Sequence, residues 1–168
     1  MAGIACAVAL VAGCGTGTVD GEALTDSGNG EPTFSPCDDI PDEAVAGLGM
    51  DPASESRDIL GVKTPGWNGC VWTTDGNSYF LRVEATVHPM SEVRGSSLFE
   101  EFEDIDVGGR PGVQFRRAAD KRRTDCYVAV ESDGGVVLTS VKEGRIVPED
   151  PCATARDATL GLSSWIPE

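Results

Sequence analysis

The sequence predicts an α+β fold: an antiparallel sheet with helices packed on one side, two disulfides and a single domain. Segments of strand length with alternating apolar residues are separated by short turns rich in Asp, Asn and Gly. Prolines with acidic neighbours, which often begin helices, occur near both ends of the globular part. Successive strands joined by short turns favour an antiparallel sheet over a parallel one.

The chain opens with an apolar run that ends in Val11-Ala12-Gly13-Cys14. A branched aliphatic residue, a small residue, Gly and Cys form the pattern of a bacterial lipobox, and the uncharged run before it fits a signal peptide. We therefore interpret residues 1–13 as a lipoprotein signal peptide and Cys14 as the lipidation site. This predicts a protein on the extracytoplasmic face of the cell membrane, held there by palmitate or a similar lipid on Cys14. No Lys or Arg lies between Met1 and Val19, which leaves a start upstream of Met1, or a buried N-terminal strand, as alternatives.

Residues 14–33 are rich in Gly, Ser, Thr and acids and offer little apolar surface to bury, so we expect a flexible, lipid-anchored tether. Residues 34–168 have the length of one ordinary domain and should form a single α+β unit.

The predicted elements follow the order α-β-β-α-β-β-β-β-α. Residues 41–48 read as a short helix, because Pro and acids begin it and Gly47 and Gly49 end it. Strands are expected at 70–74 and 79–87, and in the second of these Arg82, Glu84 and Thr86 fall on one face, which should be wet.

Residues 91–102 have weaker helical character. Two short strands are expected around the Gly-rich turn within 106–115, and a hairpin joins 126–131 to 136–142 through Ser132-Asp133-Gly134-Gly135. A C-terminal amphipathic helix should begin near Pro148 and run toward Trp165.

The cysteines point to an oxidising compartment. Apart from Cys6 and Cys14, an even number remains: Cys37, Cys70, Cys126 and Cys152. None of these pairs has C-x-x-C spacing, which argues against a zinc or thioredoxin-like site. Three pairings are open, and we favour Cys37–Cys70 with Cys126–Cys152, because each closes a loop of moderate length between a helix start and a strand start.

Catalytic motifs are absent from the sequence. His88 is the single histidine, which removes most Ser-His-Asp, Cys-His and histidine-based metal sites, and it sits at a strand end where a solvated role is expected. No Gly-x-Ser-x-Gly, His-Glu-x-x-His or phosphate-binding loop occurs. We therefore expect no enzyme activity, no cofactor and no metal. A carboxylate-based hydrolase remains a remote alternative, because acidic residues are abundant.

The net charge of −15, from 28 acids and 13 cations, argues against nucleic-acid binding. Six of the cations nevertheless fall within residues 110–123. Residues 116–123, here called the basic loop, are either an ordinary exposed connection or a binding surface for lipid head groups, cell-wall polymer or an acidic partner. Its candidate binding residues are Arg116, Arg117, Arg122 and Arg123.

Trp67 is the candidate binding residue among the aromatics. It lies in Pro65-Gly66-Trp67-Asn68-Gly69, which reads as a loop. A large aromatic there either packs against the Cys70 end of the sheet or presents a binding surface. Trp72, in contrast, lies within a strand and should belong to the core.

The spacing of Phe34-Ser35-Pro36-Cys37, Trp67-Asn68-Gly69-Cys70-Val71-Trp72, Val107-Gly108-Gly109, Cys126 and Asp150-Pro151-Cys152 resembles a group of small actinobacterial lipoproteins. This group is known as a domain of unknown function, number three-five-five-eight. The resemblance covers the whole chain, including the lipobox. It implies the envelope location, the disulfides and the fold class, and it transfers no catalytic residues.

Two functions are therefore expected for a cell-envelope lipoprotein. The first is a non-catalytic binding or sensor module for a lipid or other envelope metabolite, held in a pocket between sheet and helices. The alternative is an adaptor that binds another envelope protein through its sheet face or its basic loop.

Overall fold

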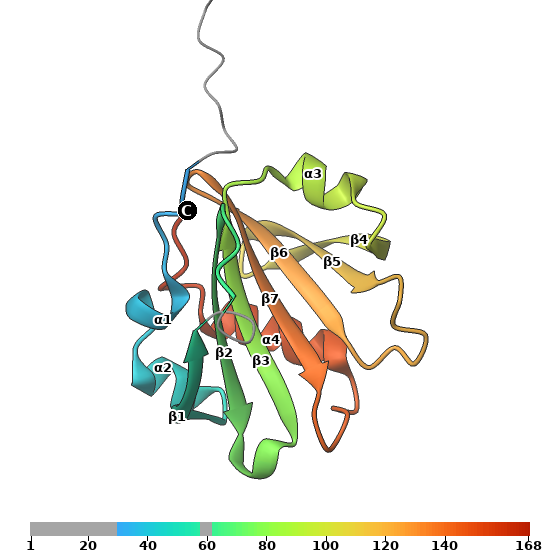
Figure 1. Ribbon diagram of the computed structural model, residues 1–168. Helices are drawn as coiled ribbons and strands as arrows, with labels where there is room; N and C mark the ends of the chain where they lie inside the picture. Colours follow the sequence, from blue (N-terminus) through green and yellow to red (C-terminus); the bar gives the residue numbers. More distant parts are fainter. Residues whose placement is uncertain (1–29, 58–61) are drawn as a thin grey trace, which may run out of the picture.

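The computed structural model describes residues 30–57 and 62–168. They form one antiparallel sheet of seven strands in the order β1-β2-β3-β7-β6-β5-β4 (Figure 1). The strands are β1 (Met50–Arg57), β2 (Trp67–Thr74), β3 (Tyr79–Thr86), β4 (Phe99–Val107), β5 (Arg110–Arg117), β6 (Cys126–Ser132) and β7 (Gly135–Glu143). The predicted fold class is confirmed. The predicted signal peptide and lipobox, with Cys14, and most of the predicted tether lie outside the described residues.

The helices lie on both faces of this sheet, whereas the sequence predicted them on one side. They are α1 (Pro36–Asp39), α2 (Asp42–Gly47), α3 (Met90–Gly95) and α4 (Pro151–Gly161), and a 3-10 turn, η1, spans Asp75–Asn77. Three of them, α1, α2 and α4, pack on one face, while α3 lies against the other. Figure 1 shows α4 behind the sheet and α3 near its upper end. Within the described part of the chain, no helix is long and apolar enough to span a membrane.

The larger core lies between the sheet and the three helices of the first face. Trp72, Leu81, Val83 and Val128 from the sheet are at most 2% exposed, and Ala155 of α4 is fully buried against this cluster. Both disulfides, Cys37–Cys70 and Cys126–Cys152, join a helix to a strand in this layer, as predicted. Burial of this apolar surface supplies most of the driving force that holds the helices on the sheet.

The second face carries a smaller, aromatic core. Phe115 is fully buried, and its ring centroid lies 4.7 Å from that of Phe99, 5.1 Å from that of Phe102 and 5.4 Å from that of Tyr127. Val93 of α3, 6% exposed, packs on this cluster. The second face is thus only partly covered, by one short helix and its flanking segments.

Local turn chemistry explains the two tightest hairpins. Gly108 and Gly109 connect β4 to β5 with φ values of 66° and 92°, and Asp133-Gly134 connects β6 to β7 with φ of 82° at the glycine. Two-residue hairpins of this kind favour Gly, Asn and Asp because positive φ is required. At the start of α4, the side chain of Asp150 accepts hydrogen bonds from the backbone N–H groups of Cys152 and Ala153.

Three predicted elements are corrected by the structure. The helix expected at 91–102 ends at Gly95, and Phe99–Phe102 begins strand β4. Strand β1 was not predicted, because its sequence MDPASESR contains Pro and few apolar residues, as an edge strand tolerates. The helix expected to run toward Trp165 ends at Gly161.

Every described strand, helix and disulfide lies within residues 30–168. The first described segment is fastened to the sheet, because the side-chain amide of Asn68 donates to the carbonyl oxygens of Pro32 (3.0 Å) and Phe34 (3.2 Å). Phe34 is itself 5% exposed and packs in the larger core. A chain that begins at residue 15 therefore keeps every described contact.

Candidate functional site

A pocket of about 600 Å³ opens on the second face of the sheet, beside α3. Strands β2, β3, β6 and β7 form its floor. One wall consists of the segment that runs from the end of β3 through α3 to the residues that follow α3. Residues 62–67 form the other wall. The lining residues are Val62, Thr64, Trp67, Gly69, Arg82, Glu84, His88, Glu92, Val93, Ser96, Leu98, Phe99, Arg117, Tyr127 and Leu138. This volume falls in the range of ordinary small-molecule sites.

The pocket has an apolar rim. Val62 and Leu98 are 65% and 68% exposed, and they are among the most exposed large apolar side chains of the described residues. Trp67 lies between rim and floor, half-buried, and packs against the aromatic cluster. Apolar side chains at an opening favour a ligand that is itself partly apolar.

Two charged side chains lie on the pocket floor. Arg82 and Glu84 are two residues apart on β3, so they share a face, and Arg82 donates to the Glu84 carboxylate. Their side chains are only 12% and 13% exposed. Burial raises the pKa of Glu84, an effect opposed by the positive charges of Arg82 and Lys142. Removing an ion pair from water to this extent costs desolvation free energy, so the pair contributes little net stability to the fold.

This pair also corrects a prediction. The face of β3 that carries Arg82, Glu84 and Thr86 was expected to be exposed to solvent. Thr86 is only 2% exposed, however, and the other two side chains are largely buried. The covering elements, α3 and residues 62–67, come from other parts of the chain.

Trp67 lies in the pocket, but its predicted secondary structure is wrong. It begins strand β2 rather than lying in a loop, and its backbone pairs with Thr86. Its ring centroid lies 5.8 Å from that of His88. His88, predicted to be a solvated surface residue, lines the same pocket, and its Nδ1 lies 2.8 Å from a carboxylate oxygen of Glu92. The proximity of Trp67 and His88 depends on the β2–β3 register, which the sequence alone does not give.

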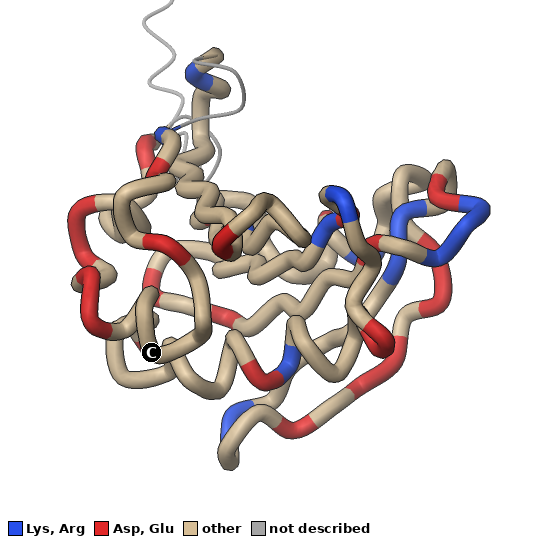
Figure 2. Tube along the Cα trace, turned by 90° about the horizontal axis from the view of Figure 1, so that it is seen from below, with Lys and Arg blue, Asp and Glu red and all other residues tan. Residues whose placement is uncertain are grey.

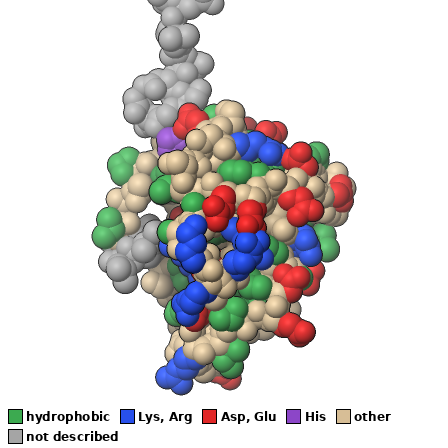
Figure 3. Space-filling view, turned by 90° about the vertical axis from the view of Figure 1, so that its right-hand side faces the viewer, with side chains coloured by type: hydrophobic (Ala, Val, Ile, Leu, Met, Phe, Trp, Pro, Cys, Tyr) green, Lys and Arg blue, Asp and Glu red, His purple; other side chains and the backbone are tan. Residues whose placement is uncertain are grey.

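The candidate arginines of the basic loop are all engaged with acceptors from the same chain. Arg116 and Arg117 form the end of β5, and Arg122 and Arg123 lie in the connection to β6. Their partners are carbonyl oxygens of residues 123 and 125 for Arg116, Asp125 for Arg117, Glu143 for Arg122 and Glu101 for Arg123. Figure 2 shows this basic stretch beside acidic residues of neighbouring segments, and Figure 3 shows Lys and Arg side chains against Asp and Glu.

These contacts reduce the positive potential that the loop offers to a partner. The ion pairs of Arg122 and Arg123 are the exposed ones, and such pairs contribute little stability individually. Of the four arginines, only Arg117 also lines the pocket, so the structure brings one basic-loop residue together with Trp67.

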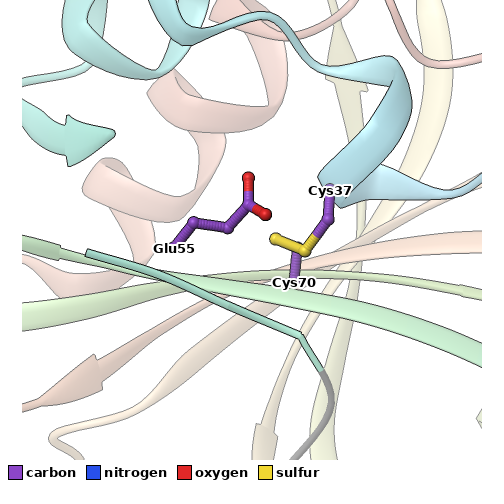
Figure 4. Close-up of side chains that lie close together, drawn as sticks. All are labelled: Cys37, Glu55 and Cys70. Atoms are coloured by element: carbon purple, nitrogen blue, oxygen red, sulfur yellow. A yellow bond between two sulfur atoms is a disulfide. The ribbon is translucent and has the colours of Figure 1, made fainter. Parts of the chain in front are cut away.

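One group of candidate metal ligands occurs among the described residues: Cys37, Glu55 and Cys70. The sulfur atoms of the two cysteines are bonded to each other, with the Glu55 carboxylate beside them (Figure 4). Because metals bind the thiolate form of cysteine, a disulfide leaves Glu55 as the single strong ligand of this group.

One of three comparisons with known proteins gives a match. Residues 9–160 match the family described as Protein of unknown function (DUF3558). The chain belongs to this family. No curated protein and no solved structure matches the chain. The predicted membership of this domain family is thus confirmed, and the match assigns no function.

Proposed function

We propose that this DUF3558 protein is the non-catalytic ligand-binding module of a cell-envelope lipoprotein, and that the pocket beside α3 holds a lipid or another amphiphilic envelope metabolite. The observation that carries the proposal is the pocket itself: about 600 Å³, with apolar walls and a few polar groups gathered on its floor. A filled second face would have favoured an adaptor instead.

The proposed location rests on three features. The lipobox ends at Cys14, the family match begins at residue 9 and so includes it, and the two disulfides suit an oxidising compartment. We propose that lipid on Cys14 anchors the protein to the extracytoplasmic face of the membrane. Between Cys14 and Gly30 the chain can span at most about 55 Å, so the pocket would stay near the lipid surface.

The arrangement of carboxylates supports binding rather than hydrolysis. Of the two carboxylates in the pocket lining, Glu84 is paired with Arg82 and Glu92 is hydrogen-bonded to His88. A carboxylate hydrolase needs one protonated and one free carboxyl group on either side of the scissile bond.

Native mass spectrometry of residues 15–168, exported and purified without denaturation, tests the proposal. We expect a discrete added mass that leaves on unfolding. Gly69→Phe should abolish it, because Gly69 lies on the pocket floor and an added Cβ would meet only the side chain of Glu84 at 3.5 Å and a carbonyl oxygen at 4.0 Å, so the ring would project into the pocket.

Thr73→Phe is the matched control, since Thr73 lies on the same strand and face but outside the pocket lining. A folded wild-type chain without added mass, also after incubation with envelope lipid extract, would contradict the proposal and favour the adaptor. Retention of the added mass by Gly69→Phe would place the ligand elsewhere.

A further inference from the structure

Polar side chains with unpaired atoms gather at and beside one end of the pocket floor. Arg82, Ser140 and Tyr127 lie directly opposite one another on β3, β7 and β6, so their side chains face the same side of the sheet. Arg82 and Tyr127 line the pocket, together with Arg117 from the end of β5. Lys142 lies two residues beyond Ser140 on the same face of β7, in an adjoining hollow that Arg117 also lines.

Several of these groups are buried without a hydrogen bond. Within the described part of the chain, Arg82 Nε, Arg117 Nε and Ser140 Oγ have no hydrogen-bond partner, and Ser140 is only 1% exposed. Buried polar atoms are normally satisfied, because leaving one unpaired costs free energy. All three can donate a hydrogen bond. All three donors therefore lack a hydrogen-bond acceptor.

The positive charge of Lys142 is not balanced by a close carboxylate. Its ammonium group forms no ion pair among the described residues and lies 5.7 Å from the centroid of the Tyr127 ring. The nearby carboxylates have other partners: Glu84 pairs with Arg82, Asp125 with Arg117 and Glu143 with Arg122. Asp120 accepts hydrogen bonds from the backbone of Arg122 and Asp125.

Lys142 is also held in a costly environment. Burial lowers its pKa, and the charges of Arg117 and Arg82 act in the same direction. A half-buried ammonium group beside two guanidinium groups is unfavourable in the free protein. The carboxylates of Asp125 and Glu84 offset part of this cost, and an anion beside Lys142 would relieve the rest.

We infer that the pocket takes an amphiphile with an anionic head group, which binds at Lys142, Arg117 and Arg82 while the apolar part lies among Trp67, Leu98 and Leu138. This inference rests on the proposed function and adds the charge of the ligand and its orientation. The head group accepts hydrogen bonds from the Lys142 ammonium group and from the guanidinium groups of Arg117 and Arg82, and the tail leads toward the apolar rim. Charge-assisted hydrogen bonds to a carboxylate or phosphate oxygen are the strongest available to these donors.

The test uses residues 15–168 and a fluorescent polyene fatty acid, cis-parinaric acid, with its uncharged methyl ester as the second probe. We expect the acid to bind on the order of tenfold more tightly than the ester. This affinity ratio corresponds to the free energy of one charge-assisted hydrogen bond that the ester does not form. Lys142→Gln should remove most of that preference and leave ester binding unchanged. Lys142→Arg should retain it.

Arg145→Gln is the matched control, because it removes an exposed cation three residues away that lies outside the pocket lining. Equal binding of acid and ester by the wild type, or equal effects of Lys142→Gln and Arg145→Gln, would overturn the inference while leaving the proposed function intact. Failure of both probes to bind the folded wild type would count against the proposed function itself.

Inorganic phosphate, added as a competitor, separates an amphiphile site from a small-anion site. We expect it to displace the acid only weakly, since it lacks the apolar part that fills the pocket. Displacement as effective as that by unlabelled fatty acid would show that a free anion, and not a lipid, is the ligand. Far-ultraviolet circular dichroism and melting curves of each variant confirm that loss of binding does not reflect unfolding.

Discussion

The ion pair between Arg82 and Glu84 gives the sharpest prediction about why charges occupy the pocket floor. If the pair serves ligand binding, it should contribute little net stability, although breaking it should be expensive. Arg82→Met leaves the Glu84 carboxylate without its partner in a site where it is 13% exposed. Losing one member of a buried ion pair lowers the free energy of unfolding by about 3–5 kcal/mol. Glu84 keeps some solvent access and has Lys142 nearby, so we expect the loss for Arg82→Met to be about 3 kcal/mol.

The double variant Arg82→Met with Glu84→Met removes both charges and should be within about 1 kcal/mol of the wild type, or more stable. Urea unfolding followed by tryptophan fluorescence at about pH 7.5 measures all three free energies of unfolding. A cost below about 1 kcal/mol for Arg82→Met, or a double variant as unstable as the single one, would refute this reasoning.

The same variants carry a pH signature. Burial raises the pKa of Glu84 in the folded state above its unfolded value, so the folded state binds the proton more tightly and stability rises as pH falls through the folded-state pKa. Arg82→Met removes the opposing charge and raises this pKa further. The loss of unfolding free energy in Arg82→Met should therefore become smaller as the pH falls from about 7.5 to 5. The double variant has no carboxylate at position 84 and should show no such change.

The remaining predictions concern the frame that holds the pocket. Replacing Cys126 and Cys152 by Ala should lower the free energy of unfolding by about 3.5 kcal/mol, the loop-entropy value for a separation of 26 residues, and an unchanged urea midpoint would contradict this. Phe115→Ala should cost about 4 kcal/mol in the same assay, because Phe115 is fully buried among three aromatic rings; a cost under about 1 kcal/mol would show that the second core is loose. Asp150→Ala should cost about 1 kcal/mol at neutral pH through loss of the α4 N-cap. Hydrogen bonds from the Ala153 and Cys152 backbone lower the pKa of Asp150, so this contribution is present above the unfolded pKa and should fade as pH falls through the folded one; a pH-independent difference in melting temperature would argue against it.

Much of the frame was predictable because its signals are local. The β6–β7 hairpin follows from Asp133-Gly134 between two apolar segments. A helix start was predicted near Pro148, and α4 begins three residues later, at Pro151, with Asp150 as its N-cap. The two disulfides follow from four cysteines placed near element starts, and their pairing is confirmed.

The error at residues 91–102 has a definite physical cause. Strand β4 shifts register between Glu100 and Glu103, and Glu101 has a φ of 60°. This irregularity breaks the two-residue alternation, so that Phe99 and Phe102, three residues apart, both pack against the second core. A spacing of three is what a helix would show, and the sequence therefore mimics one.

The pocket was harder to predict than the frame. Charges on one face of a strand normally indicate solvent, and nothing near Arg82 and Glu84 in the sequence signals that α3 and residues 62–67 cover them. Trp67 was recognised as a candidate because the sequence places a large aromatic in a predicted loop, where it either packs against the sheet or presents a binding surface. Lys142 and Ser140 gave no signal, since their significance depends on the register of three strands.

We propose that the ligand binds in the pocket beside α3, which Arg117 also lines, and not at the exposed residues 118–123 of the basic loop. Amide and indole chemical shifts of ¹⁵N-labelled residues 15–168, recorded while cis-parinaric acid is added, test it most directly. We expect shifts at the Trp67 indole and at the amides of Gly69, Ser96 and Leu138, with Arg122 and Arg123 unaffected. Shifts confined to residues 118–123, or no shifts at all, would contradict it.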